Sequence, residues 1–331
     1  MRPMTTIKVA MLGRLSCLAA GLLAAASCSA ADVYPTKPVR WLAPVLAGGA
    51  GDIIARTIAP KLAEIWGQPV VIENRPGGGG TIGMALAAKM PSDGYTLVLG
   101  VSSYVVMAPG VYTKLAYDPV RDFAPVTQIL SAPLILLAHP SLPASGVKEL
   151  IALARTRPDA VSYGTPGNGS AAHLSMEMLA SMSGTRLLHV PYRGAPPALA
   201  DLIAGQISVY MGTVPAALPL VRAGRLKVLA TSGAVRSRVI PEVPTVSESG
   251  LKGYEVTTWY GVLVPAGTPA TLISRINADL VRVIRLPEVG ERFAAEAGET
   301  VGSTPEAFGT FIVAELAKWA RVARASGAKV D

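Results

Sequence analysis

A regular alternation of short apolar runs with longer amphipathic runs most constrains the fold. Residues 39–44 form an apolar run of strand length, followed by a glycine-rich loop and a run of helical periodicity at residues 53–62. Asp52 is placed to cap that helix, and Pro60 predicts a kink or break in it. Strands that alternate with helices are typical of α/β folds with parallel strands.

The same alternation continues along the chain. Strands are expected at residues 39–44, 70–73, 95–100, 134–138, 162–164, 189–192, 209–211 and 226–231. Helices are expected at residues 147–157, 170–183, 196–204 and 215–223, with others starting near residues 52 and 81. Two helices are expected to close the chain, one starting at Pro269 and one at a capping box in residues 303–306.

Residues 1–31 have the pattern of a secretory signal peptide. A basic start precedes an apolar stretch, and small residues at positions 29–31 predict cleavage before Asp32. Cys28 offers a rival interpretation as a lipid-anchored N-terminus, but residues 25–27 lack the leucine that such a site usually carries. Both cysteines, Cys17 and Cys28, lie in this leader, so the mature chain has no disulfide and no thiolate. We expect a periplasmic protein.

The charge of the chain does not indicate a nucleic-acid partner. Lys and Arg number 30 against 22 Asp and Glu, a net charge of +8, and loss of three leader charges leaves +5. The excess is scattered, without a basic run or interleaved aromatic residues. About 300 residues remain after the leader, which is enough for two α/β domains with their own cores.

The stretch ENRPGGGGTIG at residues 73–83 contains the spacing of a dinucleotide-binding turn. Gly78, Gly80 and Gly83 fit G-x-G-x-x-G, but that fingerprint also needs an acidic residue at the end of the next strand. The next strand ends at residues 100–103 without a carboxylate. We therefore interpret the glycines as a strand-to-helix turn with positive φ angles.

The sequence offers no catalytic or metal-binding set. It contains neither a G-x-S-x-G nucleophile elbow nor a P-loop. Its histidines are His139, His173 and His189. His173 and Glu177 lie four residues apart on a predicted helix, but two ligands do not make a metal site, and a surface or capping role is favoured. We expect no catalysis, no metal and no cofactor.

Three neutral loops point to a different chemistry. Residues 44–52, 100–104 and 165–170 are rich in Gly, Ser, Thr or Asn, and each follows a strand or begins a helix. Ligands of open α/β sheets bind outside the carboxyl ends of strands, where free N–H groups and helix dipoles favour anions. Ordinary turns share this composition. The repeated pattern, in an exported chain without catalytic residues, favours a protein that binds a small carboxylate.

Ten segments between about residue 34 and residue 326 occur in an order typical of one family. They read YPTKPVRWLAP, GGAGDIIAR, GQPVVIENRPGGGG, DGYTLVLG, YDPVRDFAPV, YGTPGNGSAAHL, HVPYRG, VPTVSESGL, PAGTP and FIVAELAKWARV. The chain thereby resembles the tripartite tricarboxylate transporter substrate-binding proteins, also called the Bug family of extracytoplasmic solute receptors. The resemblance implies a type II periplasmic-binding protein fold, with two α/β lobes joined by two crossover strands and a ligand cleft between them.

The resemblance also implies boundaries and a site. Lobe 1 would comprise residues 32–132, lobe 2 residues 133–255, and residues 256–331 would return to lobe 1, with crossovers near residues 123–130 and 256–264. Members of the family bind amino acids, di- and tricarboxylates or aromatic acids. Carried over by motif, the ligand-binding residues are Gly48, Gly49, Asp52 (chiefly a helix cap), Ser102, Ser103, Gly167, Asn168, Gly169, Ser170, His173 and Arg193, with Tyr192 beside Arg193.

Two departures from the family pattern bear on the ligand. Residues 44–46 read Pro-Val-Leu where the family usually has an aromatic residue after the proline. Residues 212–215 read Gly-Thr-Val-Pro where the family commonly has an acidic residue that could meet an ammonium group. We therefore expect a di- or tricarboxylate or an aromatic acid rather than an amino acid.

By resemblance, the chain is expected to be a monomeric receptor that hands its ligand to a membrane permease. A second interpretation is a ligand-sensing protein that acts on a sensor kinase. A third is an exported hydrolase that uses Ser170 with His173, although no orienting acid is evident.

Overall fold

The computed structural model of the protein describes residues 34–295 and 297–330. Lys37–Asp331 form one compact unit. The expected signal peptide, its cleavage site before Asp32 and the rival lipid anchor at Cys28 lie outside the described residues. Within those residues, no helix combines the length and the apolar character needed to cross a membrane.

The strands of the described residues form one continuous sheet. They are β1 (Val39–Ala43), β2 (Val70–Asn74), β3 (Thr96–Val101), β4 (Phe123–Ala138), β5 (Ser162–Thr165), β6 (Leu188–Pro191), β7 (Val209–Thr213), β8 (Lys227–Thr231), β9 (Thr257–Pro265) and β10 (Glu299–Thr300). Their order across the sheet is β2-β1-β3-β9-β4-β7-β5-β6, and β8 and β10 both pair with β4. The predicted strands are present, most within two residues of their expected ends.

Helices connect the strands. They are α2 (Ala50–Trp66), α3 (Thr81–Ala87), α4 (Ala108–Val111), α5 (Val147–Thr156), α6 (Ala171–Ser183), α7 (Ala195–Ile203), α8 (Val214–Arg222), α9 (Ala270–Ile284), α10 (Pro287–Ala295) and α11 (Pro305–Ser326), with the short turns η1 (Gly78–Gly80) and η2 (Ser103–Met107). The sequence predicts two closing helices, but the structure has three. Pro287 disfavours a continuation of α9, which ends at Ile284, and it suits the first turn of a new helix.

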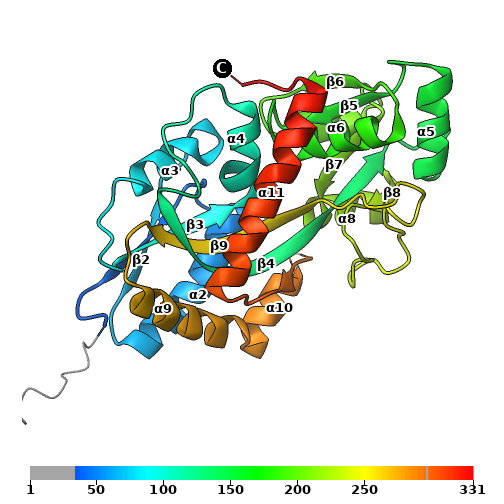
Figure 1. Ribbon diagram of the computed structural model, residues 1–331. Helices are drawn as coiled ribbons and strands as arrows, with labels where there is room; N and C mark the ends of the chain where they lie inside the picture. The colour runs from blue at the N-terminus through cyan, green and yellow to red at the C-terminus, as the bar shows by residue number, and fades with distance from the viewer. Residues whose placement is uncertain (1–33, 296, 331) are drawn as a thin grey trace, which may run out of the picture. The chain divides into compact units, whose positions relative to one another are not determined.

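β4 joins two halves of the sheet (Figure 1). Up to Pro133 it pairs antiparallel with β9, and from Leu134 it pairs antiparallel with β7 and β8. β1 pairs parallel with β2 and β3, and β5 pairs parallel with β6 and β7. The prediction of parallel strands is therefore correct within each half and wrong for the connecting strands. The strand expected at residues 134–138 and the crossover expected at residues 123–130 are parts of one strand.

We call the two halves the first lobe and the second lobe. The first lobe contains β1 to β3, β9, β10 and the first part of β4, with α2 to α4 and α9 to α11; the second contains the rest of β4 and β5 to β8, with α5 to α8. Trp41 and Ile54 are buried in the core of the first lobe. Leu137, Leu202 and Tyr210 belong to a separate core cluster in the second. This two-lobed α/β architecture agrees with the predicted fold class.

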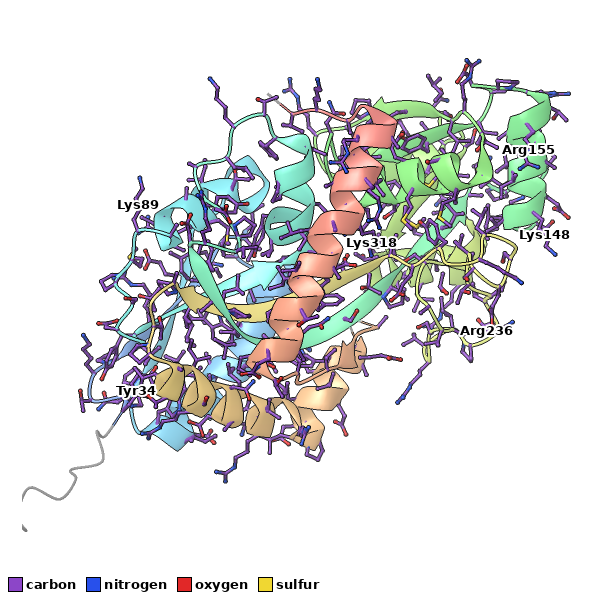
Figure 2. The ribbon with its side chains drawn as sticks, in the orientation of Figure 1. Tyr34, Lys89, Lys148, Arg155, Arg236 and Lys318 are labelled. Atoms are coloured by element: carbon purple, nitrogen blue, oxygen red, sulfur yellow. The ribbon has the colours of Figure 1, made fainter. Side chains whose placement is uncertain are left out.

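The C-terminal helix α11 lies across both lobes (Figure 1). It packs on β4, α4 and η2 of the first lobe and on α6 of the second. Trp319 is fully buried and donates its indole N–H to Glu315 at 2.9 Å. Lys318 projects from the middle of the helix (Figure 2) and donates to the carbonyl oxygen of Glu255 at 3.4 Å. Since Glu255 stands just before β9, α11 fastens the lobes where the chain returns to the first lobe.

Two helix details bear on the prediction. Of the kink or break predicted at Pro60, the break is absent, because α2 continues through this proline as one helix. α11 begins after Thr304, whose hydroxyl accepts the N–H of Ala307 at 3.2 Å. The residue expected to cap it, Ser303, instead accepts the N–H of Gln128 at 2.9 Å. The serine hydroxyl is thus engaged by β4, and the cap moves one residue along.

Candidate ligand-binding cleft

A cleft lies at the carboxyl ends of the parallel strands of both lobes. It consists of a first-lobe hollow of about 370 Å³, a middle hollow of about 60 Å³ and a second-lobe hollow of about 190 Å³. Ala50 and Tyr260 line both the first-lobe and the middle hollow. Leu134, Thr213 and Thr258 line both the middle and the second-lobe hollow. The three hollows therefore adjoin one another along β4 and β9, and we call them together the cleft.

The start of α2 forms part of the first-lobe wall. The helix begins at Ala50 with Gly49 as its N-cap, so Asp52 is the third helical residue and not the predicted cap. The N–H groups of Ala50 and Gly51 find no acceptor in the described part of the chain, as expected in the first turn of a helix. Both residues line the first-lobe hollow. Gly48, which precedes the cap, has a φ of 80° that suits glycine.

Asp52 stabilises this turn from the side that faces away from the cleft. Its side chain is buried and accepts the N–H of Gly48 at 2.8 Å and the Nε–H of Arg56 at 2.9 Å. Asn74 donates to the same carboxylate at 2.9 Å and to the carbonyl oxygen of Val45 at 3.3 Å. Burial acts to raise the pKa of Asp52, but the hydrogen bonds and the Arg56 charge together lower that pKa below its ordinary value. The ionised carboxylate is thus used within the protein and does not line the cleft.

The turn after β3 brings one of its two serines to the cleft. Ser102 is fully buried, and its hydroxyl has no hydrogen-bond partner among the described residues. Ser103 lines the first-lobe hollow and begins the π-helical turn η2. Such turns occur frequently at functional sites. Of the predicted pair, Ser103 faces the cleft and Ser102 does not.

The loop from β5 to α6 uses most of its own N–H groups. Gly167 donates to the hydroxyl of Thr165 at 3.3 Å, and Ser170 donates to the carbonyl oxygen of Gly167 at 3.3 Å. Gly169 donates to Nδ1 of His173 at 3.1 Å. The hydroxyl of Ser170, the N-cap of α6, accepts the N–H of His173 at 3.2 Å. The predicted residues Gly167 and Gly169 therefore shape this loop, and their N–H groups are already paired. Asn168 between them lies at the exposed tip of the loop.

The next two residues supply unpaired donors in the second lobe. Ala171 and Ala172 form the first turn of α6, and within the described residues their N–H groups have no acceptor. Both line the second-lobe hollow beside Ser170. Sequence reasoning missed these alanines because their side chains carry no chemistry. The available signal was the helix start expected at residue 170, since a helix start always leaves backbone donors unpaired.

His173 lies behind the loop, where it is 6% exposed and lines none of the three hollows. Its ring stacks on that of His189 with centroids 4.0 Å apart, and Tyr163 stacks on His189 at 4.9 Å. Burial, with a smaller effect of the neighbouring His189, lowers the pKa of His173 to about 4. Burial also lowers the pKa of His189. Between the surface role and the capping role considered for His173, the structure supports the capping role, and as a predicted ligand residue His173 is not in the cleft lining.

Tyr192 and Arg193 follow β6 beside the same loop. Tyr192 donates its N–H to the carbonyl oxygen of Thr165 at 2.9 Å and its hydroxyl to Asp201 at 2.6 Å. Arg193 is exposed and has no hydrogen bond or ion pair to the described residues. It does not line the hollows, so Tyr192 braces the loop while Arg193 remains an unpaired cation next to it.

No charged side chain lines the cleft in the part of the chain that the structure describes. The starts of α2, α6 and α8 contribute to this lining, and its hydroxyl-bearing residues are Ser103, Tyr104, Ser170, Tyr210, Thr213, Thr258 and Tyr260. The second-lobe hollow is otherwise largely apolar, with Leu134, Leu137, Leu199, Tyr210 and Met211 in its wall. Such a cleft can hold an anion by neutral donors and helix dipoles, and an apolar group beside it.

The glycine-rich turn forms another part of the first-lobe wall. Gly77, Gly78, Gly79 and Gly80 all have positive φ angles, as predicted. A Cβ on Gly80 would lie 2.2 Å from the ring of Tyr104, so only glycine fits. These glycines let the chain turn and pack closely between β2 and α3, which agrees with our interpretation of them as a strand-to-helix turn.

The hydrolase interpretation finds no support in the geometry. The hydroxyl of Ser170 accepts a backbone N–H, and Nδ1 of His173 accepts another, so His173 is not placed to act as a base for Ser170. Glu177 accepts the hydroxyl of Tyr163 and lies 3.9 Å from Nε2 of His173. Among the described residues there is no group of three or more His, Cys, Asp or Glu that could hold a metal ion.

The chain is similar to solute receptors along most of its length. Residues 54–328 match the family described as tripartite tricarboxylate transporter family receptor. BugT of Bordetella pertussis is 35% identical over 301 residues, which are 91% of this chain and 92% of BugT. The structure of R. palustris Rpa4515 with adipate is 36% identical, with a TM-score of 0.78 over 90% of this chain and 100% of that one. MatC of Rhodopseudomonas palustris with bound malate is 30% identical, with a TM-score of 0.75 over 88% and 100% of the two chains. The chain therefore belongs to the tripartite tricarboxylate transporter receptor family, whose members are periplasmic solute-binding receptors of two-lobed fold and not enzymes.

Proposed function

We propose that this receptor binds a small carboxylate without an ammonium group, either a di- or tricarboxylate or an aromatic acid. The neutral cleft carries this proposal. Several helix starts line it, those of α2, α6 and α8 among them, and no charged side chain among the described residues lines it. Backbone donors at a helix start hold an anion without a counter-charge. An ammonium group would find no carboxylate in this lining, and an unpaired buried cation costs several kcal/mol.

The ligand carboxylate lies at the start of α6 in this proposal. Ala171 and Ala172 offer two unpaired N–H groups there, and a hydrogen bond to a charged acceptor contributes about 1.5–3 kcal/mol. At the start of α2, the buried carboxylate of Asp52 already occupies the favourable field of that helix. The N–H groups of α2 and the hydroxyl of Ser103 then bind a second polar group of the ligand.

The carbon skeleton occupies the second-lobe hollow, which is walled by Leu137, Leu199 and Met211. The similar receptor with adipate supports a chain of this kind, and the one with malate supports a shorter dicarboxylate. Asn168 and Arg193 reach the ligand only from the rim. Arg193, without a partner among the described residues, is our candidate for pairing with a further carboxylate.

The receptor acts outside the cytoplasm in this proposal. Its leader is removed before Asp32, and the lobes (residues 32–132 with 256–331, and residues 133–255) close over the ligand as β4 and β9 bend. A permease of the tripartite tricarboxylate type then takes the ligand. Supporting observations are the family match and the leader pattern in the sequence.

A thermal-shift screen of residues 32–331 tests the ligand class. The receptor is first unfolded and refolded to remove bound ligand. It is then exposed to adipate, malate, citrate, benzoate, phthalate, amino acids and NAD. A ligand at about 100 times its Kd adds roughly 2.7 kcal/mol of stability, which is a rise of a few degrees for a protein of this size. We expect rises with acids that lack an ammonium group. A rise with amino acids alone, or with NAD alone, would contradict the proposal.

A further inference from the structure

Two hydrogen bonds at the start of α6 enclose the two donors of the proposed site. Gly169 donates its N–H to Nδ1 of His173 at 3.1 Å, and His173 donates its own N–H to the hydroxyl of Ser170 at 3.2 Å. Ala171 and Ala172 lie between these ties. Their N–H directions therefore depend on how firmly His173 holds the corner at Gly169, where φ is 73°.

A second brace reaches the same loop through the neighbouring histidine. Nε2 of His189 hydrogen-bonds the hydroxyl of Thr165 at 2.7 Å, and that hydroxyl also receives the N–H of Gly167 at 3.3 Å. The rings of His173 and His189 are 4.0 Å apart and 10° from parallel. This stacking restricts the ring plane of His173, and within that plane Nδ1 points to the N–H of Gly169.

The first lobe contains a hydrogen bond of the same geometry, but its acceptor is charged. Gly48, which has a positive φ, donates its N–H at 2.8 Å to Asp52, four residues later and third in its helix. His173 is likewise third in its helix and four residues after Gly169. The difference is charge. A carboxylate at residue 173 would stand beside the anion that α6 is proposed to bind, whereas a neutral imidazole makes the tie without repelling it.

We propose that His173 is a positioning residue, which acts through Gly169 to aim the N–H groups of Ala171 and Ala172 at the ligand carboxylate without touching the ligand. The assignment of the carboxylate to α6 rests on the proposed function. His173 is 6% exposed and lines none of the hollows, which separates it from the ligand. Its low pKa keeps the ring neutral near pH 7. Because Nδ1 accepts a hydrogen bond, the proton of the neutral ring is on Nε2, which faces Glu177 at 3.9 Å.

Three substitutions separate the effect of the hydrogen bond between Gly169 and His173 from the effect of the space that the ring fills. His173→Asn keeps a neutral acceptor near the position of Nδ1, His173→Leu removes the acceptor, and His173→Asp keeps an acceptor but adds charge. His139→Asn is the matched control on a histidine outside the cleft lining. The Kd for adipate is measured by calorimetry at pH 7.5, and amide hydrogen exchange of Gly169 is measured in the ligand-free receptor.

We expect the Asn variant to bind adipate within about 3-fold of the parent, and the Leu variant about 10-fold more weakly, the effect of one hydrogen bond. The Asp variant should bind at least about 10-fold more weakly although its Gly169 amide stays protected, because two carboxylates then repel each other. Equal affinities for the Asn and Leu variants would overturn the proposal, since a ring that only fills the core is lost in both.

The exchange measurement needs no ligand, so it tests the inference even if the parent binds no acid of the screen, a result that would count against the proposed function instead. In the ligand-free receptor, Gly169 should exchange about 10-fold faster or more in the Leu variant and close to the parental rate in the Asn variant. Should the Leu variant fail to fold, His173→Gln, whose amide stands one carbon further out, takes its place. Unchanged exchange at Gly169 without the acceptor would overturn the positioning role by itself.

Discussion

Asp52 and His173 make the same hydrogen bond at the starts of two helices in different lobes. Asp52 accepts the N–H of Gly48 at 2.8 Å, and His173 accepts the N–H of Gly169 at 3.1 Å. Each acceptor is the third residue of its helix, and each donor is a glycine with positive φ four residues earlier. The two lobes thus fix their cleft-facing turns by one local geometry, with an ionised side chain in one and a neutral ring in the other.

Replacement of Asp52 by Asn should destabilise the first lobe. Asn retains an acceptor for Gly48, but the substitution removes the buried negative charge to which Arg56 and Asn74 each donate a hydrogen bond at 2.9 Å. We expect the free energy of unfolding to fall by about 1–3 kcal/mol, measured by urea denaturation. Glu64→Gln on the same helix breaks an exposed pair with Lys61 and is the control, with an expected change within about 0.5 kcal/mol. Equal losses in both variants would contradict the role given to Asp52.

Ala171→Pro should delete one donor of the proposed site with little effect on stability. Ala171 is the first residue of α6, a position that tolerates proline because its N–H has no helical partner. Ser170 before it already has the extended conformation that proline demands, with φ −66° and ψ 158°. We expect the affinity for the bound carboxylate to fall about 10-fold or more, measured by calorimetry.

Two variants control for the other effects of that proline. Ala171→Val adds bulk at the same place but keeps the N–H, and we expect it to bind more tightly than Ala171→Pro. Ala270→Pro places proline at the exposed first residue of α9, outside the cleft lining, and should leave affinity unchanged. A loss in the valine variant as large as in the proline variant would assign the effect to bulk and not to the donor.

Most helices and strands could be predicted from local sequence patterns. Features that depend on which strands pair with each other could not be predicted in this way. The apolar run that became β1 is bounded by its own turn residues, so it could be read from the sequence. β4 pairs with β9 at one end and with β7 at the other, and its buried run carries no mark of that change. At the cleft, the structure brings the predicted loops together, but the sequence did not single out the unpaired backbone donors. The N-cap of α2 is Gly49 and not Asp52, so the side chain of Asp52 is buried and stabilises the turn instead of capping the helix. The backbone N–H of Ala171 could not be found from the side chains in the sequence, because an alanine side chain does not indicate a binding role.

The buried His173 should make stability fall in mild acid. The folded protein holds the pKa of His173 at about 4, whereas its ordinary value is 6.5. Below about pH 6.5 the unfolded chain binds a proton that the folded chain refuses, so the stabilising contribution is complete above pH 6.5 and is lost as the pH falls toward 4. A shift of this size corresponds to roughly 3 kcal/mol. We expect urea denaturation at pH 7.5, 6, 5 and 4.5 to show this decline.

His173→Asn isolates that contribution, because asparagine does not titrate while His189 remains. The variant can be less stable than the parent at pH 7.5, so the measured quantity is the slope of the unfolding free energy against pH. We expect a shallower slope between pH 6.5 and 4.5, with a residual part from His189, whose pKa is also lowered by burial. Identical slopes would show that His173 titrates normally in the folded protein.

Gly261→Ala tests the packing of α11 on the connecting strands. A Cβ on Gly261, in the middle of β9, would lie 2.4 Å from the ring of Phe308 and 2.9 Å from the carbonyl oxygen of Thr127. Phe308 is fully buried against Trp259, with ring centroids 5.4 Å apart, so it has little room to move. We expect Gly261→Ala to lower the free energy of unfolding by about 1–3 kcal/mol or more.

Gly290→Ala is the opposite case. Gly290 lies inside α10, and a Cβ there meets nothing within 4 Å. Alanine should raise the free energy of unfolding by about 0.5–1 kcal/mol, because it restricts the unfolded chain and favours the helix. Urea midpoints of the two variants should therefore move in opposite directions from the parent. If Gly261→Ala left the midpoint unchanged, α11 could not be seated on β9 as closely as the contact of Phe308 with Gly261 requires.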